Sequence, residues 1–326
     1  MLVQQISTSA TIQDGGRVGY RGLGVGTSGA MDTFALHAGN IWLGNDANAP
    51  ALEIVLGGVA LLFDKPAVIC LTGAVLSAHK TSKDGTVTPV YHHWRTPIQA
   101  GDSLVLGQAV QGMYAYLCIA GGGFTVPKVL GSASTNSKAG FGGYDGRALQ
   151  VGDSLPYCAS SQGQLQAFSA FVEELPMIGE GKTALTPIRV LPSSEYDLFD
   201  QDSIDALSSP WQVSSSSNRM GYRLMGTPLT QTGATQLLSH GVDKGMIQVP
   251  PEGQPIVLLA DAQTTGGYPK IASVIQADLG RLAQVRLGRY CQFVWVDKAT
   301  AVQAYARRAR FLARLAAYVD LDLGEK

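Results

Sequence analysis

The chain has 326 residues, 45% of them hydrophobic and 15% charged, which is enough sequence for two packed domains. Its 24 Lys and Arg residues nearly balance its 25 Asp and Glu residues, so a net charge of -1 excludes a broad basic surface for nucleic acid or anionic lipid. No apolar run reaches the roughly 18 residues of a membrane-spanning helix.

The N-terminus lacks a charged segment followed by an apolar one, so we expect no secretory signal. The four cysteines are scattered without paired spacing, which disfavours a disulfide framework or a zinc site. These features predict a cytoplasmic protein with no metal-ligating set.

Short apolar runs bounded by Gly, Pro and Asp predict β-strands along the whole chain. They lie at 51–56, 59–63, 67–72, 103–106, 113–119, 188–191, 247–249, 256–260, 271–275 and 292–296. Such runs are typical of sheets closed into barrels or sandwiches. They do not alternate with long amphipathic helices, so a doubly wound α/β fold is disfavoured.

Helical periodicity is confined to a few segments. Residues 30–43 place apolar side chains on one face, and a second helix is expected after Ser193 or Ser194. The third is predicted over 299–319. Its expected apolar stripe consists of Val302, Ala306, Ala309, Leu312, Ala316 and Val319, with Arg307, Arg310 and Arg314 on another face. A packed terminal helix with a solvated basic face is the favoured interpretation.

An internal echo suggests duplication. The segment 17–24, RVGYRGLG, recurs as RMGYRLMG at 219–226. A repeat of this long period fits two related β-domains rather than a solenoid. We therefore predict domains at 1–185 and 186–326, with the linker near 176–187.

Three segments combine glycines with amide, acidic and cationic side chains. They are 11–20 continuing to 28–32, then 217–223, and finally 245–251 followed by 259–270. Glycine lets backbone approach a ligand closely, and the neighbouring polar groups suit a small-molecule site. We expect the three segments to converge on one pocket.

These segments resemble the biotin-dependent carboxyltransferase-like family, also called allophanate hydrolase subunit 2 or KipA-type. The similar motifs are IQDGGRVGY at 12–20, SGAMD at 28–32, FGGYDGRAL at 141–149, NRMGYRL at 218–224 and QTTGGYPKI at 263–271. The resemblance spans nearly the whole chain. It implies a mainly β protein of two cyclophilin-like β-barrel domains, with a few short helices and a C-terminal helix.

The resemblance also implies an activity. A free-standing member of this length is expected to act in an ATP-dependent 5-oxoprolinase complex, alongside KipI-type and LamB/YcsF-type subunits, opening 5-oxoproline to glutamate. ATP would be a co-substrate of the complex, and a requirement for Mg²⁺ is left open. Two other functions stay open: transfer of a carboxyl group from carboxybiotin to a urea-like substrate, and non-catalytic regulation of a KipI-type protein. The chain has no Met-Lys-Met carrier motif, so biotin would have to be supplied in trans.

The substrates of this family share a planar N–H beside a C=O, and amide side chains can donate to and accept from such an edge. The candidates for this recognition are Gln13, Asn218, Gln248 and Gln263. Further substrate-binding candidates are Ser28, Tyr222, Arg223, Thr264, Gly267, Tyr268 and Lys270.

Charged side chains in the same segments are the catalytic candidates. Arg17 and Arg219, like Arg223 and Lys270, suit a carboxylate or a transferring phosphoryl group. Asp14, Asp32 and Asp261 are candidate bases or acids, with helix capping as the alternative role for Asp32.

Overall fold

The computed structural model describes residues 1–160, 166–168, 176–232 and 237–324. The contacts divide the chain into two compact units. The sheet unit contains Met1–Arg17, Ser28–Val172 and Ala309–Lys326, and the barrel unit contains Val18–Thr27 and Glu173–Arg308. By these contacts the main division lies near residue 172, and two short segments, 18–27 and 309–326, belong to the unit that is distant in sequence. The predicted domain boundary at 185 stays a prediction.

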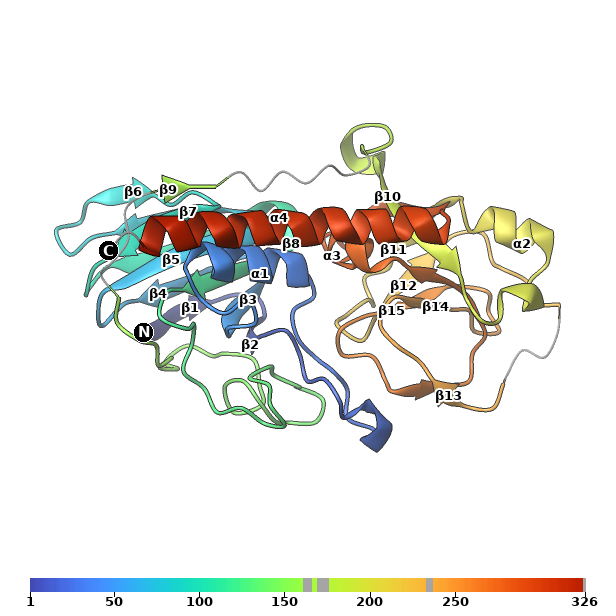
Figure 1. The fold of residues 1–326 in the computed structure, drawn as a ribbon, viewed down its shortest axis with the longest axis horizontal. Coiled ribbons are helices and arrows are strands. Elements are labelled where there is room, and N and C mark those ends of the chain that lie inside the picture. Colours follow the sequence, from blue (N-terminus) through green and yellow to red (C-terminus); the bar gives the residue numbers. More distant parts are fainter. Residues whose placement is uncertain (161–165, 169–175, 233–236, 325–326) are drawn as a thin grey trace. The chain divides into compact units, whose positions relative to one another are not determined.

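The sheet unit is built on a nine-stranded, largely antiparallel sheet (Figure 1). Its strands are β1 (Leu2–Ile6), β2 (Ala10–Gln13), β3 (Ala51–Val55), β4 (Val59–Leu62), β5 (Ala67–Thr81), β6 (Val87–Pro89), β7 (Trp94–Ile98), β8 (Ser103–Ile119) and β9 (Gln166–Ala167). The main order is β1-β4-β8-β5-β7-β9, β3 joins β2 to β8, and β6 pairs with β5. The long strand β8 pairs with β4 at its start and with β3 near its end, so two sets of strands share it.

One face of this sheet buries the apolar core of the unit. Its members come from all parts of the sheet and from the loops after β8, and they include Ile12, Ile54, Leu61, Phe63, Leu71, Leu104, Leu117, Phe124 and Tyr157. The alternation of strand residues places Glu53, Cys70, Thr72, Tyr116 and Cys118 on the other face, where they are also buried.

Helix α1 (Thr33–Trp42) packs against β5 and β8 on that other face (Figure 1). It begins where Asp32 Oδ1 accepts a hydrogen bond from the amide of Ala35 at 3.1 Å, which is the usual way of satisfying a helix start. Beneath the helix, Tyr116 Oη donates to Glu53 Oε2 at 2.8 Å and accepts from the amide of Asp32 at 2.8 Å. This buried network ties the start of α1 to β3 and β8.

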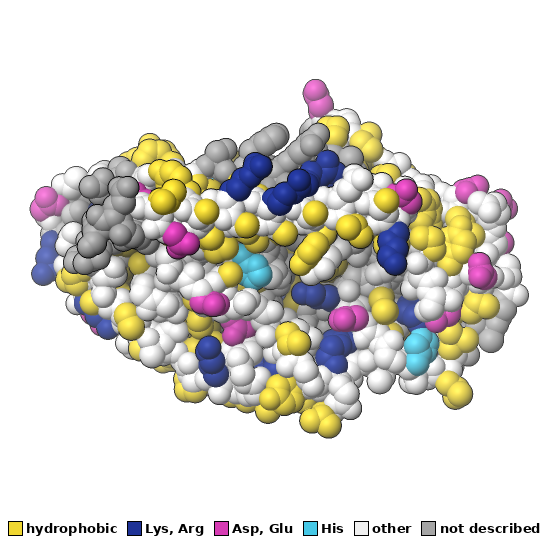
Figure 2. Space-filling model, viewed as in Figure 1, with side chains coloured by type: hydrophobic (Ala, Val, Ile, Leu, Met, Phe, Trp, Pro, Cys, Tyr) yellow, Lys and Arg dark blue, Asp and Glu magenta, His cyan; other side chains and the backbone are white. Residues whose placement is uncertain are grey.

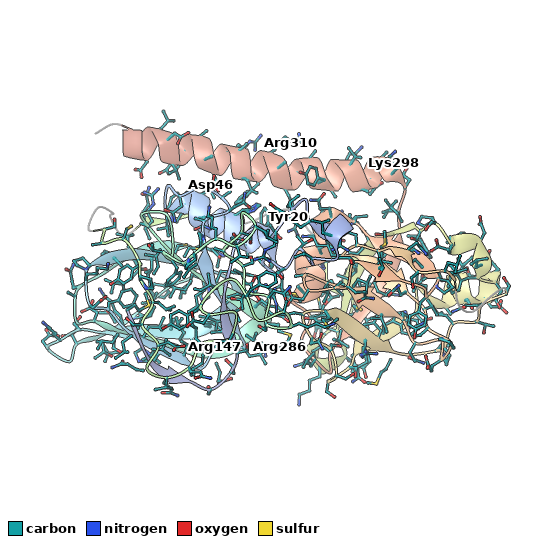
Figure 3. The ribbon with its side chains drawn as sticks, turned by 90° about the horizontal axis from the view of Figure 1, so that it is seen from below. Tyr20, Asp46, Arg147, Arg286, Lys298 and Arg310 are labelled. Carbon is teal, nitrogen blue, oxygen red and sulfur yellow. The ribbon has the colours of Figure 1, made fainter. Side chains whose placement is uncertain are left out.

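The last helix, α4 (Lys298–Gly324), contributes its second half to the sheet unit, where it lies along α1 (Figure 3). Phe311 packs on Phe34 with ring centroids 5.6 Å apart, and Tyr318 stacks on Trp42 at 5.8 Å. Arg95 lies over the Trp42 ring at 4.2 Å and pairs with an aspartate near the end of α4. Aromatic packing and this ion pair therefore fix the end of the helix.

The faces of α4 differ in part from the predicted stripe. The stripe residue Val319 is buried as predicted, but Val302 is 59% exposed, and Ala304 and Leu315, outside the predicted stripe, are buried. Ala304 packs with Ile275 and Ala277, contacts that no periodicity in the sequence could specify. The predicted basic face is confirmed, since Arg307, Arg310 and Arg314 are exposed, and Figure 2 shows Lys and Arg side chains gathered along α4. No helix in the described ranges is both long and apolar enough to cross a membrane.

The barrel unit contains a closed seven-stranded barrel. In barrel order the strands are β10 (Leu185–Pro192), β17 (Lys270–Val274), β14 (Met246–Gln248), β15 (Ile256–Leu258), β12 (Gly221–Met225), β11 (Pro210–Val213) and β18 (Tyr290–Trp295). All neighbours are antiparallel except β10 and β18. The buried strand residues include Ile188, Val190, Trp211, Leu224, Ile247, Val257 and Phe293.

Short elements complete this unit. A two-stranded ribbon pairs β13 (His240–Gly241) with β16 (Thr265–Gly266). The helices are α2 (Gln201–Ala206), α3 (Leu279–Ala283) and the 3-10 turns η1 (Arg21–Leu23), η2 (Gly181–Thr183), η3 (Tyr196–Leu198) and η4 (Gln276–Asp278). The helix expected after Ser193 or Ser194 begins instead at Gln201, because Asp200 Oδ1 accepts from the amide of Ser203 at 2.8 Å. The mainly β fold with few helices and a C-terminal helix is confirmed.

Replacing Tyr116 by Phe tests the network beneath α1. Burial, together with the Glu53 and Asp32 carboxylates, raises the pKa of Tyr116 well above its usual value, so the hydroxyl stays protonated and donates. We expect the Tyr116→Phe variant to lose about 1–3 kcal/mol of unfolding free energy in urea titrations, because a buried carboxylate loses a donor. The control Tyr91→Phe alters a side chain that is 56% exposed and should change the free energy by less than about 0.5 kcal/mol. Equal effects of the two substitutions would contradict this account.

Candidate functional site

The predicted site residues fall in both units. The sheet unit contains Gln13, Asp14, Arg17, Ser28 and Asp32. The barrel unit contains Asn218, Arg219, Tyr222, Arg223, Gln248, Asp261, Gln263, Thr264, Gly267, Tyr268 and Lys270. Some members of each set contact one another within their own unit, and the convergence of both sets on one ligand stays a prediction.

Asp14 is the centre of a buried loop junction in the sheet unit. Its carboxylate accepts from Ser132 Oγ at 2.7 Å, from Ser134 Oγ at 2.5 Å, from the amide of Ala133 at 2.6 Å and from the amide of Gly16 at 2.8 Å. Three of these donors reach Oδ1, and the amide of Ala133 reaches Oδ2. This geometry favours a positioning role over the predicted role as a base, since the carboxylate holds the 132–134 loop at the end of β2.

Arg17 holds the same region from the other side. Its Nε donates to the carbonyl of Val129 at 2.9 Å and its Nη2 to the carbonyl of Ser134 at 2.9 Å. The guanidinium lies 4.7 Å from the centroid of the Phe141 ring, and the side chain is fully buried. Arg17 therefore organises the loop that follows β8, and its predicted contact with a substrate anion stays a prediction.

Gln13 Oε1 and Ser28 Oγ are among the buried polar atoms of the sheet unit that have no hydrogen-bond partner among the described residues. The other end of the Gln13 amide donates to Thr11 Oγ1 at 3.0 Å and to the carbonyl of Thr135 at 3.3 Å. Ser28 has a φ of +52°, a left-handed conformation that is uncommon for a residue with a Cβ and is concentrated at functional sites. Both features keep these two atoms as binding candidates.

Asp32 caps α1, the alternative role that its position before a helix suggested, and it lies in a network that the sequence analysis missed. Glu53 and Tyr116 are both buried, and Glu53 Oε2 also accepts from the amide of Met31 at 2.8 Å. Glu53 lies within the apolar run 51–56, and a charged residue inside such a run is a sign of a buried polar side chain. No spacing rule would have linked it to Tyr116, more than sixty residues away.

In the barrel unit, Arg219 and Asp261 join the second and third motifs. Arg219 Nε donates to Asp261 Oδ2 at 2.8 Å and Nη2 donates to Oδ1 at 3.2 Å, which is the paired geometry that fits a guanidinium to a carboxylate. The amide of Asp261 also donates to the carbonyl of Arg219 at 2.9 Å. Nearby, Asn218 Oδ1 accepts from the amide of Met220 at 2.8 Å, which shapes the turn before β12.

Tyr222 and Arg223 are adjacent in β12, so their side chains point to opposite sides of the barrel wall. Tyr222 is fully buried and its hydroxyl donates to the carbonyl of Ala283 at 2.7 Å, so it packs in the barrel core. Arg223 points outward and is exposed. Tyr268 is 38% exposed, and it remains the better candidate for the wall of a site. The backbone carbonyls of Thr264 and Gly267 accept hydrogen bonds in the segment that includes the β13–β16 ribbon.

A compact polar cluster surrounds Lys270, a side chain that is only 1% exposed. Its Nζ lies 2.5 Å from Glu195 Oε2 and contacts His240 Nε2, and Glu195 Oε1 lies 3.5 Å from His240 Nε2. Burial raises the pKa of Glu195, but hydrogen bonds from Lys270 and Ser194 outweigh it and the pKa lies below its usual value. The sequence analysis identified neither His240 nor Glu195 in this role.

Gln248 and Gln263 lie beside this cluster. Gln263 Nε2 donates to Gln248 Oε1 at 3.3 Å, and Gln248 is paired across β14 and β17 with Lys270. The loop 18–27 reaches the same unit through Arg21, whose Nη2 contacts the carbonyl of Val242 and donates to the carbonyl of Gln263 at 3.2 Å. A cation, its counter-ion and two amides can bind a small planar molecule with donors and acceptors on one edge.

Three of the four cysteines are buried, and Cys158 is exposed. No group of three or more His, Cys, Asp or Glu side chains in the described ranges is arranged to hold a metal ion. Burial raises the pKa of Cys291 to about 12 and raises that of Cys70 and Cys118 above the usual value, which keeps these thiols protonated.

Residues 23–295 match the family model described as carboxyltransferase domain, subdomain A and B. The chain is 45% identical to the 5-oxoprolinase C subunit of Escherichia coli, over 94% of both chains, and 42% identical to the 5-oxoprolinase C subunit of Haemophilus influenzae, over 98% of both. Its fold superimposes on the urea carboxylase of Kluyveromyces lactis with a TM-score of 0.84 and 28% identity, covering 96% of this chain and 29% of that one. The chain therefore belongs to the carboxyltransferase domain family that comprises subdomains A and B.

Proposed function

We propose that the chain is the C subunit of an ATP-dependent 5-oxoprolinase complex, which opens 5-oxoproline to L-glutamate. The observation that supports this most is full-length similarity. Identities of 45% and 42% extend over nearly all of this chain and nearly all of two proteins named as 5-oxoprolinase C subunits. Similarity on that scale leaves little of either unit uncovered.

The chemistry of the barrel unit is compatible with a lactam. The ring of 5-oxoproline presents an N–H beside a C=O and also carries a carboxylate. The amides of Gln248 and Gln263 match the first feature, because an amide donates and accepts at once. Arg219, held in a fixed orientation by Asp261, is suited to the carboxylate.

The complex would contain a KipI-type B subunit together with a LamB/YcsF-type A subunit. A relative named as one subunit of an enzyme supports assembly with other chains, and the resemblance of the sequence to KipA-type proteins supports these two partners. ATP would enter as a co-substrate, accompanied by Mg²⁺. We place the working enzyme in the cytoplasm, and we expect turnover only in the complex.

A second candidate function is carboxyl transfer from carboxybiotin to a urea-like substrate. The structural similarity to urea carboxylase favours it, since the superposition covers 96% of this chain with a TM-score of 0.84. Biotin would have to arrive on a separate carrier. A urea-like substrate presents the same N–H and C=O edge as a lactam, so the amide pair suits both.

Arg219→Ala tests the proposed site in the complete complex. We expect 5-oxoproline-dependent ATP hydrolysis to fall by about tenfold to a hundredfold, the equivalent of losing one hydrogen-bonded charge contact. The matched control is Arg147→Ala, which removes a similar two-point pair with Asp153 in the sheet unit (Figure 3). Undiminished turnover in the Arg219→Ala complex would remove Arg219 from the site, and equal losses in both variants would point to a structural effect.

Avidin separates the two candidate functions. Because the proposed ring opening uses no biotin, we expect ATP hydrolysis by the complex to be unaffected when avidin is added before 5-oxoproline. The carboxyltransferase alternative predicts loss of activity with a urea-like substrate under the same treatment. Inhibition of the 5-oxoproline-dependent rate by avidin would count against our proposal.

A further inference from the structure

The cluster around Lys270 is balanced in charge. The ammonium of Lys270 pairs with the carboxylate of Glu195 at 2.5 Å, and the same Glu195 oxygen accepts from the backbone amide of Lys270 at 3.2 Å. A buried ammonium is stable only when it is paired and hydrogen-bonded, and Glu195 provides both conditions. A further anion beside this pair would add an uncompensated buried charge.

One N–H group of the Lys270 ammonium nevertheless remains available to donate a hydrogen bond. Lysine only donates, so His240 Nε2 must accept from Lys270, and His240 Nδ1 then holds the ring proton and donates to the carbonyl of Leu238 at 2.9 Å. Glu195 and His240 thus take two of the three N–H groups of the ammonium. The described residues provide no acceptor for the third.

Gln248 provides a second donor beside it. Its Oε1 is occupied by Gln263 Nε2 at 3.3 Å, whereas its Nε2 is buried and has no partner among the described residues. The register between β14 and β17 shifts after Ile247, and this irregularity sets Gln248 opposite Lys270. Gln248 Nε2 lies against Gly266, whose ribbon partner His240 contacts Lys270 Nζ, so both donors belong to one cluster.

The β13–β16 ribbon lies against this pair of donors. Gly266 pairs with His240 across the ribbon, and a Cβ placed on Gly266 would lie 2.5 Å from Gln248 Nε2. Only glycine leaves the amide room at this position. A buried donor without a partner costs about 1–3 kcal/mol, and in native proteins such a group calls for a specific explanation.

We propose that Lys270 Nζ and Gln248 Nε2 together bind the carbonyl oxygen of a small planar amide, such as a lactam or a urea. This inference rests on the function proposed above and identifies the part of the substrate that the barrel unit binds. A neutral oxygen suits a cluster whose charges already balance, and the ammonium lies ready for any negative charge that develops on that oxygen. Gln263 is a positioning residue, because it fixes which end of the Gln248 amide faces the ligand.

Infrared difference spectra of 2-pyrrolidone labelled with ¹³C at its carbonyl test this directly. We expect the carbonyl band to move to lower wavenumber when the lactam binds the full chain or its complex, and the shift to be smaller in Gln248→Leu, where only Lys270 donates, with about tenfold weaker binding. Gln212→Leu is the matched control, since its amide donates to the carbonyl of Gly288 at 3.0 Å on another barrel strand. An equal shift in Gln248→Leu and the unaltered chain, or no lactam binding by the unaltered protein, would overturn the proposal.

A double variant tests whether Lys270 donates to the lactam. Lys270→Met alone leaves the Glu195 carboxylate buried and unpaired, so Lys270→Met with Glu195→Leu is the cleaner change, checked by circular dichroism. We expect it to bind 2-pyrrolidone at least about tenfold more weakly, and Lys298→Met on the exposed start of α4 to bind normally. Unchanged lactam affinity in the folded double variant would exclude Lys270 as a donor.

The outcome for the carbonyl site is separable from that of the proposed function. In the active complex, loss of one of two oxygen donors should lower kcat by about 10²–10³. Normal kcat for Gln248→Leu would overturn the carbonyl site and leave the 5-oxoprolinase assignment intact. A complex without 5-oxoproline-dependent ATP hydrolysis, whose binding of 2-pyrrolidone or urea still depends on Gln248, would overturn the assignment and support the site.

Discussion

A positive charge buried in the wall of a closed barrel is the constraint on which the barrel unit depends. Lys270 is 1% exposed, and its ammonium is stable there only because Glu195 and His240 are brought to it. Glu195 precedes η3 and His240 lies in the β13–β16 ribbon, so one charge determines where two otherwise separate segments must lie. The most constrained part of this unit is also the part with an unused buried donor.

The sheet unit follows the same physical rule with the opposite charge. The buried carboxylate of Asp14 gathers four donors, two of them serine hydroxyls from the loop that follows β8. Arg17 donates to carbonyls of that loop, so the aspartate and the arginine of one sequence motif both hold the same loop. Residues that look catalytic in a glycine-rich motif can thus be the ones that hold the loops in place. The buried polar atoms of Gln13 and Ser28 are then the better candidates for contact with a ligand.

The internal echo shows how similar sequence can take different local structures. In the first copy, Arg17 is buried in a loop, and Arg21 begins the turn η1. In the second copy the corresponding stretch forms the barrel strand β12, in which Tyr222 is buried and Arg223 is exposed. The neighbouring strands β11 and β15 supply the hydrogen bonds that make the second copy a strand. Local sequence thus did not decide between turn and strand here.

The sequence by itself determined the mainly β fold, the helix over α1 and the long final helix, because strand and helix periodicity reflect local burial. It also singled out the segments that contain Arg219, Gln248, Asp261 and Lys270, since glycine beside polar groups is a local pattern. Only the tertiary structure decided that the loop 18–27 belongs with the barrel unit and that Glu195 and His240 share a cation. Those pairings join residues tens of positions apart in the chain. They are required because a buried charge or amide without a partner is unfavourable, and burial arises only when the chain has folded.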